Sequence, residues 1–206
     1  MVITDLKEEI WDMEEDNSLD YYETLPRSVI LGNKEYAVKT DYRIFINFEM
    51  QMATIDQKQA VNNALNQFYW GANDDIERRG LFMEAVNTFI WFYKCGQLED
   101  YQEGRTIKKA KKVSQIFNYK YDAQLICGAY ALLGYDLHEP YMHWWKFKEL
   151  WSSLPEDCEF ARIKSYRAYD GDDKDRIELR EYYKLPPTMA EIKDSLRRKE
   201  IFNQLK

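Results

Sequence analysis

The histidines and their neighbours are the side chains in this chain best suited to chemistry. His138 and His143 flank Glu139 in the segment 138-HEPYMH-143. Two histidines bind a zinc ion together when both lie on one helical face, as in an HExxH motif. Here they are five residues apart, and Pro140 interrupts the helix that would aim both rings at one ion. We therefore expect structural or surface histidines and no metal site.

Other catalytic patterns do not occur in the sequence. It contains no GxSxG elbow, no GxxxxGK[ST] loop and no GxGxxG turn. Cys95, Cys127 and Cys158 are far apart and form no CxxC pair, which predicts reduced thiols. Spacing alone leaves Cys–His catalysis open, but Cys95 and Cys127 fall on or near apolar helix faces, where thiols are usually structural. We expect no catalytic residue, no cofactor and no enzymatic activity.

Charge is distributed unevenly along the chain. Residues 1–24 carry nine acidic side chains against one lysine, a balance of −8 in a chain with a net charge of −7. The segment 105–120 carries six basic side chains and no acidic one. A solvated loop is the simplest interpretation of this basic run. A docking site for an acidic partner, such as the acidic arm of a neighbouring subunit, comes second, and nucleic-acid binding is the least favoured. The candidate partner-binding residues are Arg105, Lys108, Lys109, Lys111 and Lys112.

The segment 141-YMHWWKFKEL-150 concentrates four aromatic rings and a histidine in seven positions. Trp144, Phe147 and Trp151 recur at spacings of three and four, so they form one ridge of a helix. A base-stacking platform would need exposed rings interleaved with Lys or Arg, so a buried core or a partner interface is the favoured interpretation. The predicted core residues are Phe89, Ile90, Leu125, Ile126, Trp144, Phe147, Trp151 and Leu154.

The elements that position these residues are predicted to be mostly helical. Eight Gly and five Pro in 206 residues leave little room for an all-β fold. Alternating apolar residues around Gly32-Asn33 predict a β-hairpin over 28–40. Beyond it, apolar residues follow helical spacing, and a loop or hinge is expected where the chain turns basic. The spacing predicts helices over 41–53, from 56, over 76–95, from 122, over 140–154 and after 157, a loop over 97–120, and a solvated helix within 170–187.

The domain organisation follows from these elements. We expect a mainly α domain of about six to eight helices with one N-terminal β-hairpin, covering residues 25–185. Residues 1–24 form an acidic N-terminal arm, and residues 186–206 form a C-terminal helix that opens with a capping box at Thr188. No run approaches eighteen apolar residues, and the first residues lack the pattern of a signal peptide, so we expect no membrane span and no export.

Three segments resemble the bacteriophage "gene product fifteen" family of siphophages and prophages of Gram-positive bacteria. The first is 25-LPRSVILGNKEYAVKTDYRIFINFE-49, the second is 119-YKYDAQLICGAYALLGYDL-137, and the third is 143-HWWKFKELWSSLP-155 with 167-RAYD-170 after it. The resemblance covers about residues 25–185.

This resemblance implies a role in phage tail morphogenesis, because members of the family are encoded in the tail-gene region beside the tape-measure gene. A tail-assembly chaperone in the host cytoplasm is the leading expectation. It would bind the tape-measure protein through helical and aromatic surfaces, with the tail-tube protein as a second expected partner, and it would self-associate. The alternatives are a structural virion component of the tail or head–tail connector and, less favoured, a nucleic-acid-binding regulator. No catalytic residue is implied.

Overall fold

The computed structural model describes residues 25–54, 56–97, 115–187, 192 and 195–197. These residues contain eight helices with defined bounds and one two-stranded antiparallel sheet, which confirms a mainly helical fold with an N-terminal hairpin. Helical residues also occur at 192 and 195–197, so the helix count lies slightly above the predicted six to eight. The acidic arm, residues 1–24, lies outside the described residues.

The hairpin forms where the sequence predicts it. Strands β1 (Ser28–Leu31) and β2 (Lys34–Ala37) pair antiparallel, and Val29 lies opposite Tyr36. Gly32 in the turn has a φ of 60°, a left-handed conformation that favours glycine. Alternation puts Val29, Leu31 and Tyr36 on the buried face, so the hairpin covers the helices behind it.

Four helices follow the hairpin, where the sequence analysis predicted three. They are α3 (Tyr42–Thr54), α4 (Gln57–Phe68), α5 (Asn73–Arg78) and α6 (Phe82–Tyr93). The predicted helix over 76–95 is therefore wrong as a single element. Gly80 has a φ of 68°, and the Leu81 amide donates to the Ile76 carbonyl at 3.0 Å, which closes α5 with a left-handed residue before α6 begins.

The second half of the described chain contains α7 (Ala123–Leu132), α8 (Trp144–Ser152), α9 (Glu159–Ala168) and α10 (Lys174–Tyr182). Helix α8 begins four residues after Pro140, so the predicted start at 140 is wrong. Residues before α8 are extended because they pair with the entry to α3: the Trp144 amide donates to the Thr40 carbonyl at 2.7 Å, and the Tyr42 amide donates to the Met142 carbonyl at 2.9 Å.

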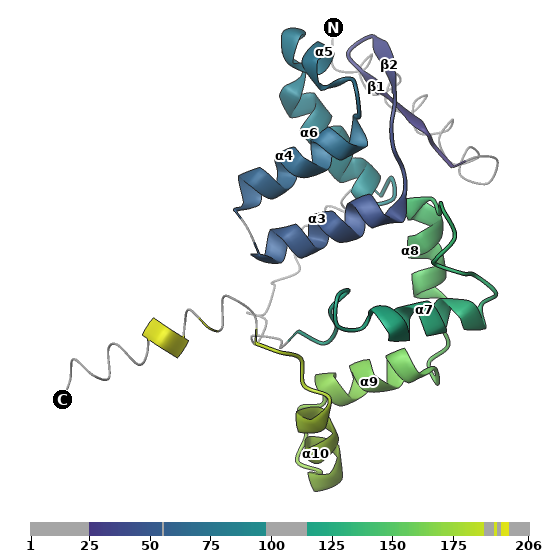
Figure 1. Cartoon of the computed structure of the whole chain (residues 1–206), viewed down its shortest axis with the longest axis vertical. Coiled ribbons are helices and arrows are strands. Elements are labelled where there is room, and N and C mark those ends of the chain that lie inside the picture. The colour runs from purple at the N-terminus through teal and green to yellow at the C-terminus, as the bar shows by residue number, and fades with distance from the viewer. Residues whose placement is uncertain (1–24, 55, 98–114, 188–191, 193–194, 198–206) are drawn as a thin grey trace, which may run out of the picture.

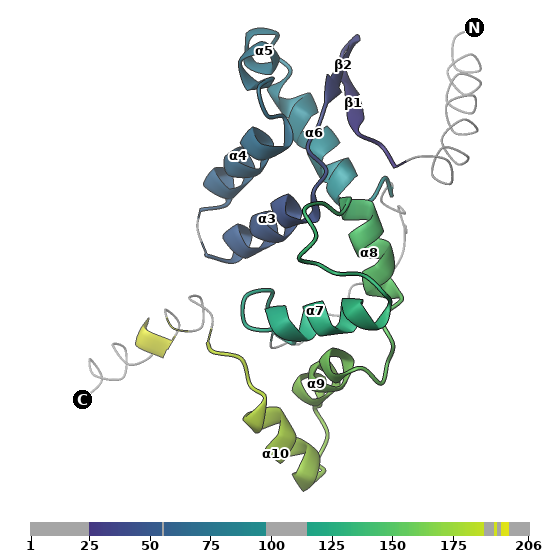
Figure 2. The ribbon, with the colours of Figure 1, turned by 45° about the vertical axis from the view of Figure 1, so that its right-hand side comes forward.

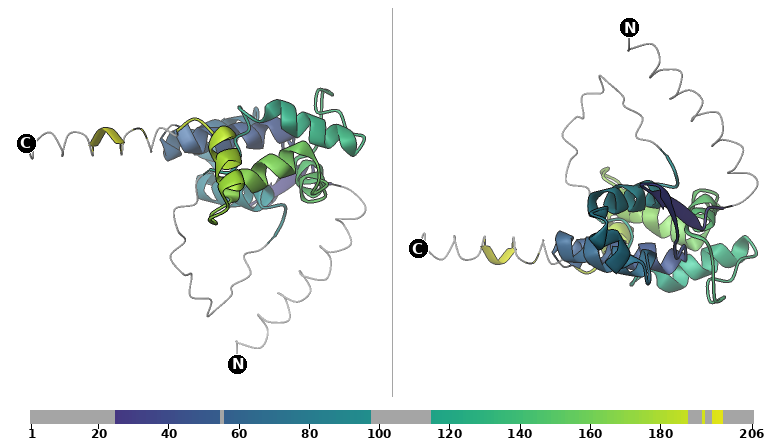
Figure 3. Two further views of the ribbon diagram at one scale, coloured as in Figure 1. Left: turned by 90° about the horizontal axis from the view of Figure 1, so that it is seen from below. Right: turned by 90° about the horizontal axis from the view of Figure 1, so that it is seen from above.

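The helices are arranged along the longest axis of the molecule. In Figure 1 the hairpin and α3–α6 occupy the upper part, α7, α9 and α10 occupy the lower part, and α8 lies between them. Figure 2 shows α8 running from the level of α3 to that of α7. The two views along the axis place α9 and α10 at one end and α5 with the hairpin at the other (Figure 3). Helix α8 is thus placed to join both parts into one core.

Candidate functional site

The aromatic segment that contains Trp144 faces the interior. The Trp144 side chain is fully buried, and its ring stacks on Phe45, Tyr93 and Phe147 with centroid distances of 4.9, 5.7 and 5.6 Å. The indole N–H groups also have partners, since Trp144 Nε1 donates to the Tyr93 carbonyl and Trp145 Nε1 donates to the Phe92 carbonyl, each at 2.8 Å. These rings are the interior of the fold.

The other predicted core residues divide into two groups. Phe89, Ile126 and Phe147 are buried in the main apolar cluster. Four more residues are half-buried and pack against that cluster from its margin: Ile90, Leu125, Trp151 and Leu154. Trp151 belongs to a second aromatic group with Phe117 and Phe160, at centroid distances of 5.2 Å each. This second group packs the segment before α7 against α8 and α9.

The two histidines do not share a site. His143 is buried and caps α8: its Nδ1 accepts from the Trp145 amide at 3.1 Å, so Nε2 carries the proton and donates to the Pro26 carbonyl at 2.8 Å. Burial lowers the pKa of His143 below its ordinary value, which keeps the imidazole neutral. His138 is exposed and bonds to Asp136. Within the described ranges, no group of three His, Cys, Asp or Glu side chains could hold a metal ion.

The cysteine thiols are free and sit in structural positions. Cys158 is buried at the N-terminus of α9 and accepts from the Ala161 amide at 3.4 Å. Burial raises the pKa of Cys95 to about 11, so this thiol stays protonated near neutral pH and is a poor nucleophile.

The basic run named by the sequence analysis lies outside the described residues. Arg105, Lys108, Lys109, Lys111 and Lys112 all fall within residues 98–114, so their role as a partner-binding site stays a prediction. The end of the predicted loop is described: residues 115–118 have no regular structure, residues 119–121 form a turn, and Phe117 packs on Trp151 of α8 and Phe160 of α9.

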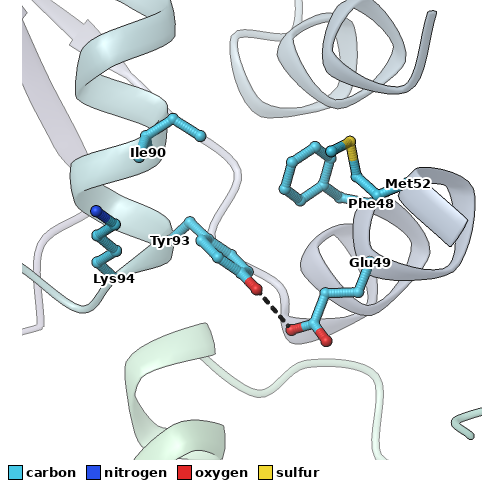
Figure 4. Close-up of a pocket in the computed structure, with 6 residues that line it drawn as sticks. All are labelled: Phe48, Glu49, Met52, Ile90, Tyr93 and Lys94. Atoms are coloured by element: carbon cyan, nitrogen blue, oxygen red, sulfur yellow. Dashed lines mark hydrogen bonds between the residues drawn. The ribbon is translucent and has the colours of Figure 1, made fainter. Parts of the chain in front are cut away.

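A pocket opens between α3 and α6 on the side of the core (Figure 4). Its volume is about 400 Å³, and its lining is mainly apolar. Phe48 and Met52 contribute from α3, Ile90 from α6, and the carboxylate of Glu49 sits beside them. Tyr93 and Lys94 complete the lining at the end of α6.

Glu49 gives this pocket an acidic group in an apolar setting. The Tyr93 hydroxyl donates to Glu49 Oε1 at 3.1 Å, as the dashed line in Figure 4 shows. Burial raises the pKa of Glu49 above its ordinary value, while interactions with the hydroxyls of Tyr93 and Tyr119 and with the positive charge of Lys148 partly oppose that shift. Burial and the nearby carboxylate also raise the pKa values of both tyrosines, so their hydroxyls remain protonated donors. Glu49 thus places an acidic group, hydrogen-bonded to Tyr93, at the wall of an apolar pocket.

Sequence reasoning missed Glu49, although a signal was present. Glu49 lies four residues after Phe45 and three before Met52, so helical spacing puts a carboxylate on the edge of the apolar stripe of α3. An acidic residue at such a position is unusual for a core-facing helix. The contribution of Tyr93, the last residue of α6, and of Lys94 after it had no such signal, because it depends on how α3 and α6 pack.

The comparison with known families gives one match. The model of the family described as "Bacteriophage Gp15 protein" matches residues 21–188, which is most of the chain. The chain belongs to the bacteriophage Gp15 protein family. Comparisons with curated proteins and with solved structures gave no match.

Membership in the Gp15 family agrees with the resemblance noted in the three sequence segments, and it makes this a bacteriophage protein. The match contains the hairpin, the pocket between α3 and α6, and all eight helices with defined bounds. No helix in the described part of this Gp15 protein is long and apolar enough to cross a membrane.

Proposed function

We propose that this Gp15 protein is a tail-assembly chaperone that binds the tape-measure protein in the host cytoplasm before the tail tube polymerises. Family membership supports a structural or morphogenetic role in the phage. The narrower role rests on the resemblance, which associates the family with the tail genes beside the tape-measure gene. Binding of the tail-tube protein and self-association of the chaperone around its client belong to the same proposal.

The observation that carries the proposal is the open apolar pocket between α3 and α6. A tape-measure protein is a long helical chain, and helical clients dock by placing apolar side chains into grooves between helices. The pocket offers a place for one such side chain, with aliphatic and aromatic walls supplied by both helices. Large apolar side chains are also exposed elsewhere, and these would extend the contact: Trp70 on the loop after α4, Met83 on α6 and Leu132 on α7.

Co-expression tests the chaperone role directly. The full chain and the tape-measure protein of the same phage are produced together and separately, and the soluble fraction of the tape-measure protein is measured. We expect soluble tape-measure protein and its co-purification only when both are present. An equally insoluble tape-measure protein in both cultures would contradict the proposal.

The main alternative is a structural component of the tail or the head–tail connector, which family membership also accommodates. Mass spectrometry of purified particles separates the two roles. A chaperone leaves before the particle is complete, so its peptides should be missing from virions, whereas a structural protein should be present in a stoichiometric amount.

A further inference from the structure

The pocket between α3 and α6 contains an ionisable group, which a purely apolar binding site would not require. Met52 and Ile90 form aliphatic walls, Phe48 and Tyr93 contribute rings, and the Glu49 carboxylate lies among them. A helix that only covered apolar surface would be better served by an apolar residue at position 49, because a carboxylate near the protein interior is costly to desolvate.

The carboxylate of Glu49 can accept further hydrogen bonds. A carboxylate can accept about four hydrogen bonds. The Tyr93 hydroxyl donates one to Oε1, and the Tyr119 hydroxyl and the positive charge of Lys148 also act on this carboxylate. In the part of the chain that the structure describes, no cation lies within ion-pair distance of Glu49. Lys94 also lines the pocket, but it takes part in another interaction and is not a free charge. Among the described residues the Glu49 carboxylate has hydrogen-bonding and electrostatic neighbours but no ion pair, so it can still pair with a cation that arrives from outside.

We propose that this pocket receives the side chain of a lysine or arginine carried by an amphipathic helix of the client. The inference rests on the proposed function and names the chemistry of the bound segment. The aliphatic stem of such a side chain packs on Met52 and Ile90, and its charged head pairs with Glu49. The rings of Phe48 and Tyr93 add a favourable contact with the cation.

The same geometry predicts the pattern of the client segment. A helix seated between α3 and α6 presents anchors at i, i+3, i+4 and i+7 on one face. One basic residue would occupy the pocket, and apolar residues three and four positions away would cover the margins of the groove. A helix that is apolar throughout would cover Glu49 without supplying a counter-ion, so it binds less well.

The experiment follows the ε-methyl NMR signal of Met52 in the full chain with ¹³C-labelled methionine, assigned with a Met52→Leu variant. The probe is a 15-residue amphipathic peptide with one central Lys flanked by Leu at positions three and four away, compared with the same peptide carrying norleucine in place of Lys. We expect the Lys peptide to shift the Met52 signal with an affinity about tenfold or more above that of the norleucine peptide.

Glu49→Gln keeps the size of the side chain and removes its charge, so it should abolish the preference for the Lys peptide. Glu178→Gln, an exposed change on α10, is the matched control and should leave the preference intact. Equal affinities for both peptides, an unchanged preference in Glu49→Gln, or no shift at Met52 would each overturn the inference. So would a Met52 signal that moves in the free protein when Arg105, Lys108, Lys109, Lys111 and Lys112 are changed to Gln, because the chain's own basic run would then occupy the pocket.

Co-purification of Glu49→Gln with the tape-measure protein separates this inference from the proposed function. If the wild type and Glu49→Gln capture the tape-measure protein equally well, the chaperone role is supported and the role of the pocket in binding a basic side chain is overturned. If the Met52 signal shows a preference for the Lys peptide but the protein does not capture the tape-measure protein, the pocket's affinity for a basic side chain is supported and the chaperone role is overturned.

Discussion

Arg167 of α9 donates two hydrogen bonds to the carboxylate of Asp122 at the start of α7, at 2.7 and 3.0 Å, and both side chains are buried. Arg167 also donates to the carbonyls of Ile116 and Tyr183, at 3.2 and 2.6 Å. Arg167 therefore connects three segments to α9: the chain that enters α7, the N-terminus of α7 and the end of α10.

Removing one partner of this pair should destabilise the protein strongly. Asp122→Asn leaves the Arg167 charge buried without its counter-ion, and we expect a loss of about 3–5 kcal/mol in the free energy of unfolding. Denaturant unfolding measures this loss. Glu159→Gln, which breaks the exposed pair between Glu159 and Arg162, is the control and should change stability far less. A similar loss in both variants would show that the buried pair has no special role.

Trp144→Ala tests the aromatic core. Because the ring is fully buried among Phe45, Tyr93 and Phe147, its removal should lower the free energy of unfolding by about 3–5 kcal/mol. The matched control is Trp70→Ala. Trp70 is 71% exposed and its ring lies under Lys39, at 3.7 Å from nitrogen to ring centroid, so about 1 kcal/mol or less should be lost. Equal losses, measured by denaturant unfolding, would contradict this account of the core.

Replacing two glycines by alanine should change the free energy of unfolding in opposite directions. Gly96 has a φ of 73°, and a Cβ there would approach the Trp145 ring to 3.0 Å, so Gly96→Ala should cost about 1–2 kcal/mol. Gly128 lies inside α7 with no atom within 4 Å of an added Cβ, so Gly128→Ala should stabilise by about 0.5–1 kcal/mol. Thermal unfolding of both variants compares the two signs, and a stabilised Gly96→Ala would be inconsistent with the described backbone.

The half-buried carboxylate of Glu49 should make stability fall as pH rises. Its pKa in the folded protein lies above the ordinary value of about 4.5, so the unfolded chain releases this proton first. The contribution is complete below pH 4.5 and is lost as pH rises through the folded-state pKa. Glu49→Gln should therefore gain melting temperature relative to wild type between pH 4 and pH 7. Calorimetry at both pH values measures the difference, with Glu178→Gln as the control, and a constant difference between Glu49→Gln and wild type would refute it.

The titration of His143 should make stability rise with pH, opposite to the effect of Glu49. Burial lowers its pKa below the ordinary 6.5, so the unfolded chain binds this proton more readily than the folded protein. Its contribution is complete above pH 6.5 and declines as pH falls towards the folded-state pKa. His143→Asn keeps a side chain suited to capping α8 and removes the titration, so its unfolding free energy should depend less on pH between 7.5 and 5.5. Parallel curves for His143→Asn and the wild type would contradict the prediction.

Local chemistry explains the elements that could be predicted from the sequence. The hairpin follows from alternation and a glycine turn. Helix α4 begins where expected because Asp56 accepts from the amides of Lys58 and Gln59. The Trp144 face was predictable from its spacing, since an aromatic ridge this dense is unstable in water. Each of these features depends on residues close together in the chain.

Contacts between distant residues decided the rest. Asp122 stands at the N-terminus of α7, as predicted, yet its side chain makes no capping bond, because Arg167, 45 residues away, binds both oxygens and the Asn118 amide donates to one of them. Helix α8 begins at residue 144 and not at the predicted 140, because residues 142–144 form hydrogen bonds with the backbone of residues 40–42. The pocket around Glu49 exists only once α3 packs beside α6. Sequence periodicity determines which face of a helix is apolar, but only packing determines which partner that face meets and which polar groups remain unpaired.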